Sequence, residues 1–346
     1  MNSRERMCRV LNHQTPDRIP TFEYAIDKKT VEAICPGGTY ADVVEKLDLD
    51  AITAWEPSSG GYVPGMADQL KAGDTFVDEW GVKRKATGEM SAYPLEDDVV
   101  IREEAELKKL NPPDPNSENR FEILRQYIKR FRGERIVSYC ILDMFEISKC
   151  LMGMEEFLIA FKQRPHLIKA LFELTTDWVI QVARKAIDIG ADMIIDNADI
   201  AYKMSSWTEP KLMRGLFVPC LKRVADAVKQ RRAYVFYHSH GNIWEVLDAL
   251  VGTGIDVLHP MAYEDGMDIS IVKKIFGEKI VVAGNISTDF LSRRSRDEVI
   301  RLVKETISRT SAGGGYILMA SSSIYSGVNP DNYRTMVQTA QSHRYR

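Results

Sequence analysis

Three of the six histidines fall in two short segments, YHSHGN at 237–242 and LHPM at 258–261. His238 and His240 are separated by one residue, so their side chains share a face if the preceding strand continues through them. Two imidazoles on one face suit zinc or another borderline metal, with a third ligand from a neighbouring strand. We therefore predict His238, His240 and His259 as metal ligands, and His238 and His240 also as catalytic residues.

Two other interpretations of these histidines stay open. They can contact substrate or move protons without a metal. They can also be structural, with His238 capping the strand, His240 bonded to a loop carbonyl and His259 packed against Pro260. The spacing alone does not separate these roles, but the position after a strand favours a functional one.

A pair of carboxylates occurs in IIDNADIAY at 194–202, where Asp196 and Asp199 flank another predicted strand end. A carboxylate there can ligate a metal, move a proton or face a substrate cation. The alternative is that one of them caps the following segment. We predict Asp196 as a catalytic residue.

Further polar and aromatic residues close the predicted strands, where barrel enzymes carry their active-site groups. Aromatic rings at such places offer apolar faces to a flat ligand. The residues predicted to contact substrate are Glu23, Tyr24, Trp55, Asp143, Asn197, Asn285 and Ser323.

To bring these residues together, the strands that carry them must end on the same side of a sheet. Short apolar, β-rich segments alternate with stretches of helical periodicity, which predicts an α/β fold of the (β/α)8 TIM-barrel type. The predicted strands are 18–24, 51–55, 135–141, 191–195, 233–237, 256–259, 279–283 and 315–319.

The gap between the second and third predicted strands is too long for one crossover, so we assign an insertion at about 57–133. Within it, DTFVDEWGVKRK at 74–85 predicts a β-hairpin that turns near Trp80 and Gly81. We predict that the whole chain, 1–346, is a single barrel domain with this insertion.

Composition narrows the function classes. The formal net charge is −3 and basic residues are interspersed with acidic ones, which argues against nucleic acid as a partner. The apolar runs are shorter than the roughly 20 residues that a membrane span needs. The five cysteines show no close pairing and the N-terminus lacks the apolar core of a signal peptide. We expect a cytoplasmic protein with no membrane contact.

Several segments together resemble the uroporphyrinogen decarboxylase superfamily, particularly its cobalamin-dependent methyltransferases. Each segment is weak evidence alone, but the set spans nearly the whole chain. The segments are RERMCRVLNHQTPDRIP (4–20), DEWGVKRK (78–85), HSHGN (238–242), LHPMAYEDGMDISIVKKIFG (258–277), VAGNIST (282–288), and GGGYILMASSS with GVNPDNYRTMV (313–337).

In that branch, a His-x-Cys-Gly-Asn motif and a cysteine after the last strand bind a zinc ion that activates a thiol. His238 matches the histidine, while His240 and the serines at 321–323 stand where the two cysteines are expected. A site with N and O donors is harder and suits polarising an ether or hydroxyl oxygen. The resemblance thus implies a zinc-dependent methyltransferase component of an O-demethylase.

Such an enzyme moves a methyl group between a small methoxylated substrate, for example an aromatic one, and the cobalt of a corrinoid. The chain has no evident cobalamin-binding segment, so a separate corrinoid protein is the expected partner; we also allow for a homodimer. Two alternatives stay open: a metal-free decarboxylase of uroporphyrinogen type and a non-catalytic tetrapyrrole- or corrinoid-binding protein. The decarboxylases carry an arginine-rich N-terminal segment, and this chain has RIPTFEYAIDKK (18–29) there.

Overall fold

A computed structural model describes residues 1–57, 70–88, 91–96 and 98–344. The remaining positions include part of the predicted insertion and lie outside the described residues. No helix within the described ranges is long and apolar enough to cross a lipid bilayer.

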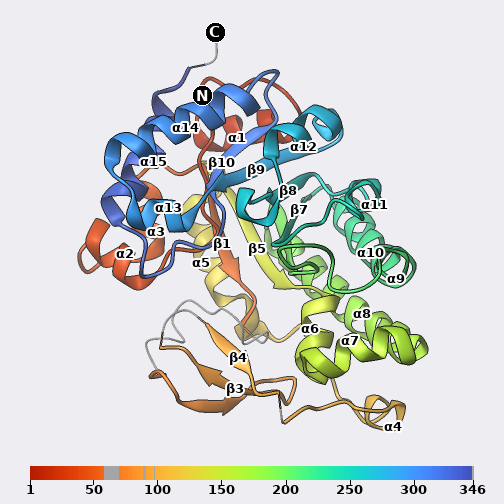
Figure 1. Ribbon diagram of the computed structural model, residues 1–346. Coiled ribbons are helices and arrows are strands. Elements are labelled where there is room, and N and C mark those ends of the chain that lie inside the picture. Colours follow the sequence, from red (N-terminus) through yellow and green to blue (C-terminus); the bar gives the residue numbers. More distant parts are fainter. Residues whose placement is uncertain (58–69, 89–90, 97, 345–346) are drawn as a thin grey trace.

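A curled seven-stranded parallel sheet forms the barrel wall, and its strands follow one another in chain order (Figure 1). Nearly every strand residue is buried, as expected for a parallel sheet covered on both faces. Seven of the eight predicted strands are confirmed. They are β1 (Ala51–Trp55), β5 (Ile136–Leu142), β6 (Met193–Asn197), β7 (Tyr234–Ser239), β8 (Val257–Pro260), β9 (Val281–Ile286) and β10 (Tyr316–Ala320).

The first predicted strand, 18–24, is wrong as a regular strand: it makes only isolated bridges, such as that between Thr21 and Leu318. Pro20 has no backbone N–H, which interrupts a regular ladder. The segment nevertheless lies between β10 and β1. The N–H of Leu318 donates to the Pro20 carbonyl at 3.0 Å, and the N–H of Asp50 donates to the Thr21 carbonyl at 2.7 Å. An irregular segment therefore occupies the eighth place in the barrel.

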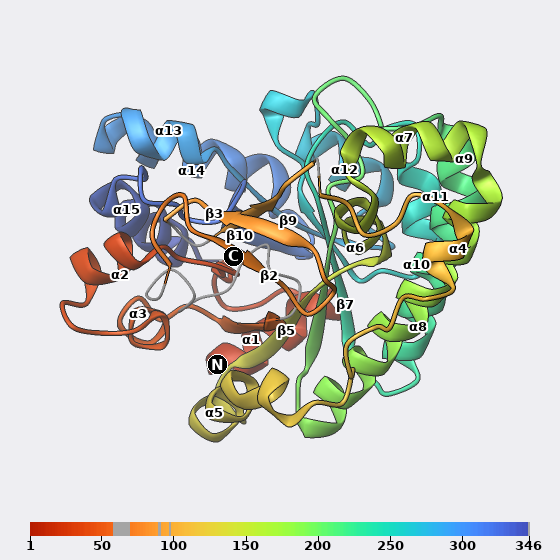
Figure 2. The ribbon, with the colours of Figure 1, turned by 90° about the horizontal axis from the view of Figure 1, so that it is seen from below.

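Helices cover the outside of the sheet and follow the strands in turn (Figures 1 and 2). Before β1 lie α1 (Ser3–Leu11), α2 (Lys28–Ile34) and α3 (Tyr40–Lys46), and before β5 lie α4 (Glu104–Leu107) and α5 (Glu122–Phe131). The others are α6 (Met144–Met152), α7 (Met154–Gln163), α8 (Pro165–Ile189), α9 (Pro210–Leu212), α10 (Val218–Lys229), α11 (Leu247–Gly252), α12 (Ile269–Phe276), α13 (Thr288–Arg293), α14 (Arg296–Thr310) and α15 (Pro330–Ser342).

Several of these helices have an N-cap residue whose side-chain oxygen accepts backbone N–H groups of the first turn. Asp143 caps α6, Ser295 caps α14 in a capping box with Glu298, and Asn329 caps α15. The start of α6 at the carboxyl end of β5 is thus fixed by the residue that directly follows that strand.

The core is divided in two by the strands, because successive strand residues point to opposite faces. In β6, Met193 and Ile195 belong to the cluster inside the barrel, together with Met7 of α1. Ile194 belongs to the larger cluster between the sheet and the helices. This alternation decides which strand-end residues face the barrel mouth.

The predicted hairpin is confirmed in the insertion, where β2 (Thr75–Val77) pairs antiparallel with β3 (Lys83–Ala86). A third strand, β4 (Ala92–Pro94), was not predicted and pairs with β3. The small sheet lies beside one end of the barrel (Figures 1 and 2). Arg120 joins the two parts, since it pairs with Glu56 directly after β1 and with Glu79 between β2 and β3, the latter at 2.7 Å.

Candidate functional site

His238 and His259, from the neighbouring strands β7 and β8, form a direct hydrogen bond inside the barrel. Their Nδ1 atoms lie 2.7 Å apart, and His259 Nε2 lies 2.9 Å from the Ala320 carbonyl oxygen at the end of β10. The two histidines are register partners, so their side chains share a face. Both are buried.

The Ala320 carbonyl oxygen determines which nitrogen of His259, and in turn of His238, carries the proton. It can only accept, so His259 carries its proton on Nε2 and presents an unprotonated Nδ1. His238 must then donate from Nδ1, and its Nε2 keeps a free lone pair. Burial lowers the pKa of both imidazoles well below the usual value, and the charge of His240 lowers that of His238 further. His238 is therefore neutral, and its Nε2 is a hydrogen-bond acceptor whose orientation is set by the bond to His259.

Asp199 faces the free nitrogen of His238. Its Oδ1 lies 3.8 Å from His238 Nε2, and its side chain is 49% exposed, whereas that of His238 is 4% exposed. The same oxygen accepts the His240 N–H at 2.9 Å. The backbone N–H of Asp199 donates to Glu146 Oε1 at 3.1 Å, and Lys149 Nζ donates to the same oxygen at 2.6 Å. The carboxylate is held at the barrel mouth.

His240 lies above His238, with ring centroids 5.2 Å apart, and its Nδ1 is 3.5 Å from Asp265 Oδ2. Asp265 also accepts the Gly241 N–H at 3.0 Å. Burial lowers the pKa of His240, but the hydrogen bond to Asp265 and the charge of Asp199 outweigh it and the net shift is upward. His240 thus binds the loop after β7 to the loop after β8.

Tyr24 and Trp55 form an aromatic wall beside the histidine pair. The Tyr24 ring centroid lies 5.2 Å from that of His238, 5.6 Å from that of His259 and 5.7 Å from that of Trp55. Trp55 Nε1 donates to the Tyr24 carbonyl at 3.0 Å. Burial and then the charge of Asp199 raise the pKa of the Tyr24 hydroxyl, so it stays protonated and can donate. The structure thus brings both residues beside the histidine pair, and their contact with substrate stays a prediction.

Asp196 is not part of this group, in contrast to the sequence prediction. It directly precedes Asn197, the register partner of His238, so its side chain points to the opposite face of β6. Its register partner on β7 is Tyr237, which belongs to the cluster between sheet and helices. The structure places Asp196 behind the barrel wall.

Asp143 and Glu23 also lie outside the barrel mouth. Asp143 caps α6 by accepting the Phe145 N–H at 2.7 Å. Glu23 is fully buried, its Oε1 accepts the Ala320 N–H at 2.6 Å, and burial raises its pKa well above the usual value. The structure therefore gives both residues structural contacts outside the barrel mouth, in contrast to the prediction that they contact substrate.

The other predicted contacts lie at strand ends. Asn197 is the register partner of His238 and shares its face of the sheet. Asn285, near the end of β9, donates from Nδ2 to the Met261 carbonyl at 2.8 Å. Ser323 is half-buried in the segment that follows β10.

The donor set does not fit a four-coordinate zinc ion as it lies. Both ring nitrogens of His259 are engaged within the protein. Serines stand after β10, where a thiolate is expected from the resemblance, and the cysteines are at 8, 35, 140, 150 and 220. Among the described residues, no group of three or more His, Cys, Asp or Glu side chains is arranged to hold a metal. Zinc stays a prediction of the resemblance.

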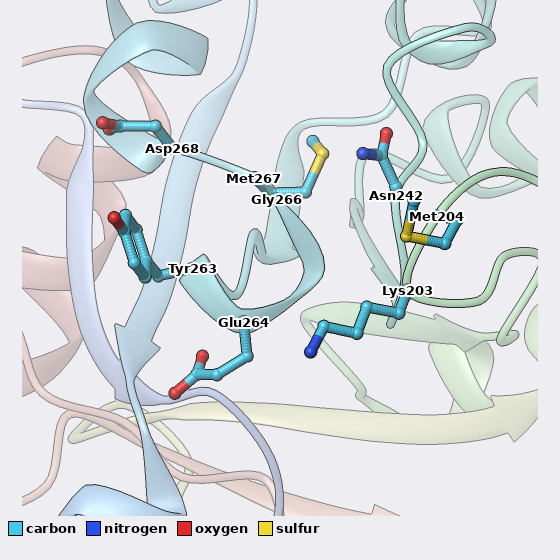
Figure 3. Close-up of a pocket in the computed structure, with 8 residues that line it drawn as sticks. All are labelled: Lys203, Met204, Asn242, Tyr263, Glu264, Gly266, Met267 and Asp268. Atoms are coloured by element: carbon cyan, nitrogen blue, oxygen red, sulfur yellow. The ribbon is translucent and has the colours of Figure 1, made fainter.

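A groove of about 450 Å³ lies on the strand-end rim beyond His240. Figure 3 shows Met204 and Tyr263 on its two sides, with Lys203 extending toward Glu264. Gly266 keeps it open, since a Cβ there would lie 3.1 Å from Asn242 Nδ2. Its walls are tied together: the Asn242 N–H donates to the Tyr202 carbonyl at 2.8 Å, and Trp244 Nε1 donates to the Gly266 carbonyl at 3.1 Å.

The N-terminal arginines are engaged at the other end of the barrel. Arg6 Nη1 lies 2.6 Å and Arg18 Nη1 lies 3.1 Å from the buried carboxylate of Asp50. These guanidinium groups are therefore committed to holding the N-terminal segment and cannot also reach a ligand at the strand ends.

The sequence prediction named Asp196 as the catalytic carboxylate and not its neighbour Asp199. Asp265 and Glu146, which hold His240 and Asp199 in place, were not predicted. Side chains alternate along β6, and Met193 and Ile195 point into the barrel. Asn197 therefore points inward and Asp196 outward, and this alternation could have excluded Asp196. Asp265 is the last residue of a short 3-10 helix, Tyr263–Asp265, and Glu146 lies in the first turn of α6. No local pattern marks either one.

Comparison with known proteins places the chain among barrel proteins. Residues 89–343 match the family model "Uroporphyrinogen decarboxylase (URO-D)". A methyltransferase from Methanosarcina mazei superposes with a TM-score of 0.71 at 16% identity, covering 98% of both chains. A B12-independent methionine synthase from Shewanella sp. W3-18-1 superposes with a TM-score of 0.54 at 11% identity, covering 86% of this chain and 83% of that one. No curated protein sequence matches.

Proposed function

Because the chain belongs to the uroporphyrinogen decarboxylase family, we propose that it is a methyltransferase acting between a small methoxylated substrate and the cobalt of a corrinoid held by another protein. The similarity in fold to a protein named as a methyltransferase supports the transfer chemistry. Corrinoid dependence and the methoxylated substrate are parts of this proposal.

The observation that carries the proposal is the free Nε2 of His238. The bond to His259 holds the ring, and the lone pair faces Asp199 at the barrel mouth. A neutral imidazole next to a carboxylate is suited to take a proton from a hydroxyl or thiol, because the carboxylate stabilises the imidazolium that forms.

Proton movement through His238 serves both directions of transfer. When a hydroxyl is methylated, His238 takes its proton while the oxygen forms the new bond to the methyl carbon. In demethylation the carbon–oxygen bond breaks with its electron pair left on oxygen, and the His238 imidazolium returns the proton to that oxygen. The corrinoid, when its protein docks, supplies the cobalt that gives or receives the methyl group.

Tyr24 and Trp55 provide the apolar side of the substrate site in this proposal. Their rings lie beside His238 and suit a flat methoxylated ring. The Tyr24 hydroxyl, kept protonated by burial, can donate to an ether oxygen. Trp55 is held by its bond to the Tyr24 carbonyl, so the wall is preorganised.

The strand-end rim is the surface on which a corrinoid protein would have to seat. Tyr202, Met204 and Tyr263 are exposed there, by 41%, 73% and 77%, beside the groove of Figure 3. Aromatic and methionine side chains are enriched at protein interfaces. This exposure supports a partner at the mouth.

Zinc does not enter the proposed steps, because the donors do not assemble a site for it. A decarboxylase acting on a polycarboxylate would need free cations for charge-assisted contacts. Arg6 and Arg18 are bound to Asp50, which favours methyl transfer over that alternative.

The test is a spectrophotometric assay of the purified chain with free cob(I)alamin and a panel of methoxylated aromatic and aliphatic donors. Methylcobalamin with hydroxyl and thiol acceptors tests the reverse direction. We expect turnover with at least one compound and a loss of about 10²–10⁴-fold in His238→Ala, the range for a general acid or base.

His166→Ala is the matched control, since His166 is exposed on α8, and should keep wild-type activity. Zinc analysis of the same preparations reports on metal content independently of turnover. An absence of methyl transfer in both directions, or full activity in His238→Ala, would overturn the proposal.

A further inference from the structure

Two carboxyl groups and a phenol project into one space behind the barrel wall. Asp196 of β6 is the register partner of Ile141 in β5 and of Tyr237 in β7. Asp143 lies two residues beyond Ile141, and its N–H donates to the Asn197 carbonyl at 3.2 Å, so it continues the ladder. Asp143, Asp196 and Tyr237 therefore point from three adjacent strands toward the helices.

These groups are buried without partners. Asp143 and Tyr237 are 0% exposed and Asp196 is 1% exposed. Within the described part of the chain, both oxygens of Asp196, Oδ2 of Asp143 and the hydroxyl of Tyr237 have no hydrogen-bond partner. One unpaired buried carboxylate is strongly unfavourable, and two ionised side by side are more so.

No cation among the described residues neutralises the pair. The titratable groups whose charges interact with the pair are Cys140 of β5, Glu146 of α6, Tyr237 of β7 and Cys220 of α10. Lys149 of α6 is bound to Glu146 at 2.6 Å and does not contact the pair. The compensation has to come from the carboxyl groups themselves.

Hydrogen bonding distinguishes the two carboxyls. Asp143 Oδ1 accepts the N–H groups of Phe145 at 2.7 Å and Glu146 at 3.0 Å, which favours its ionised form. Asp196 accepts none and has the same burial. One proton on Asp196 gives Asp143 Oδ2 a donor and leaves a single negative charge on the two buried carboxyl groups.

We propose that Asp143 and Asp196 form a buried proton-binding site, in which Asp196 carries one proton that the pair shares. Burial raises the pKa of Asp143 well above its usual value and that of Asp196 to about 7, so burial alone does not decide which carboxyl group holds the proton. The two N–H groups that Asp143 Oδ1 accepts place it on Asp196. The site lies at the ends of β5 and β6, and Asp143 joins it to the first turn of α6. That turn also holds Glu146, which accepts the Asp199 N–H, so the proton lies one helix turn from the barrel mouth. This inference does not depend on the proposed function.

Infrared difference spectroscopy of the full chain at pH 6 tests the site. A protonated carboxylic acid gives a carbonyl band above the amide I region. We expect wild type minus Asp196→Asn to show this band. Wild type minus Asp143→Asn should lack it, because the substituted asparagine can still cap α6 and Asp196 keeps its proton. The band should fade in wild type when the pH is raised above about 7.

Glu23→Gln is the control, because Glu23 is another buried carboxyl with a raised pKa, on a different segment. Its band component should be separate from that of Asp196 and should remain in Asp196→Asn. If Asp196→Asn folds with an unchanged carboxylic-acid band, or if the band disappears in Asp143→Asn instead, the assignment of the proton to Asp196 is overturned.

Discussion

His238 donates to His259 and not the reverse, because His259 uses its only N–H on the carbonyl oxygen of Ala320. This direction leaves His238 with its acceptor nitrogen toward Asp199. The chemistry available at the barrel mouth therefore depends on a histidine that does not itself face it.

The first prediction concerns His259. His259→Leu removes the acceptor for His238 Nδ1–H, so the His238 ring loses its orientation and its tautomer preference. We expect kcat to fall about 10–100-fold, the usual effect of removing a group that orients a functional histidine, with KM little changed. His259→Asn, whose side-chain oxygen can accept the same bond, should recover part of the loss. Equal losses in both variants would show a packing role only.

Asp199→Asn should lower activity without unfolding the protein. The amide keeps the shape and can still accept the His240 N–H, but it removes the charge that stabilises a protonated His238 3.8 Å away. We expect a fall in kcat of about 10²-fold, within the range for acid–base groups. The acid limb of the pH–rate profile should move to lower pH, because the His238 imidazolium loses its partner. An unshifted profile would exclude this role for Asp199.

Asp196→Asn should change how stability depends on pH. Asp196 has a pKa of about 7 in the folded chain and about 3.9 when unfolded, so the folded state holds a proton that the unfolded state releases. The stability from this group is complete below about pH 4 and is lost by about pH 7, a total on the order of 4 kcal/mol. Urea unfolding across pH 4–8 should show this decline in wild type relative to the variant. Asp297→Asn, at an exposed position, is the control.

Arg120→Met should loosen the insertion. Arg120 is buried between Glu56 and Glu79, and its loss leaves the buried Glu56 without this cation. Breaking a buried pair in this way costs about 3–5 kcal/mol. Chemical denaturation measures the change, and limited proteolysis should then cut first between β1 and α5. Arg125→Met, at an exposed ion pair, should cost about 0–1 kcal/mol. Similar costs for both variants would contradict a structural role for Arg120.

Gly241→Ala should impair the site more than Gly254→Ala. Both glycines have a positive φ, +90° and +93°, which costs an alanine about 1–2 kcal/mol. At Gly241 the new Cβ would also lie 2.4 Å from the Ala201 backbone carbonyl carbon, so the loop that carries His240 has to move. At Gly254 the nearest atom is the end of Lys229, 3.9 Å away. Thermal unfolding measures the backbone strain that both variants share, and activity measures displacement of the loop that carries His240. Equal activity in the two variants would show that this loop is not displaced.

Seven barrel strands could be predicted because buried parallel strands are short apolar runs whose boundaries are marked by turn signals. The segment at 18–24 has the same composition but contains Pro20, and only the positions of β1 and β10 decide that it fills the eighth place. Strand β4 is three residues long, too short for a periodic pattern.

The histidine site was predictable in part. His238 and His259 lie near the ends of two consecutive strands that pair in parallel, so their side chains meet on one face. Which ring nitrogen each uses depends on the Ala320 carbonyl, which the sequence does not place. Asp196 was chosen by proximity to a strand end, although the alternation of β6 directs Asn197, not Asp196, to the interior. Asp265 reaches His240 only through the loop after β8.

The irregular eighth segment has a consequence for how the chain is made. We call the junction between this segment and β10 the seam. The Ala320 N–H donates to Glu23 across it, and these two residues are 297 positions apart in the sequence. During synthesis the N-terminal segment leaves the ribosome long before its partner strand exists, so the cylinder cannot close until β10 has been made. Until then the seam presents unpaired backbone groups that can act as a template for other chains. The seam is therefore a place where the growing chain can mispair, and we expect that removal of β10 lowers the yield of soluble protein.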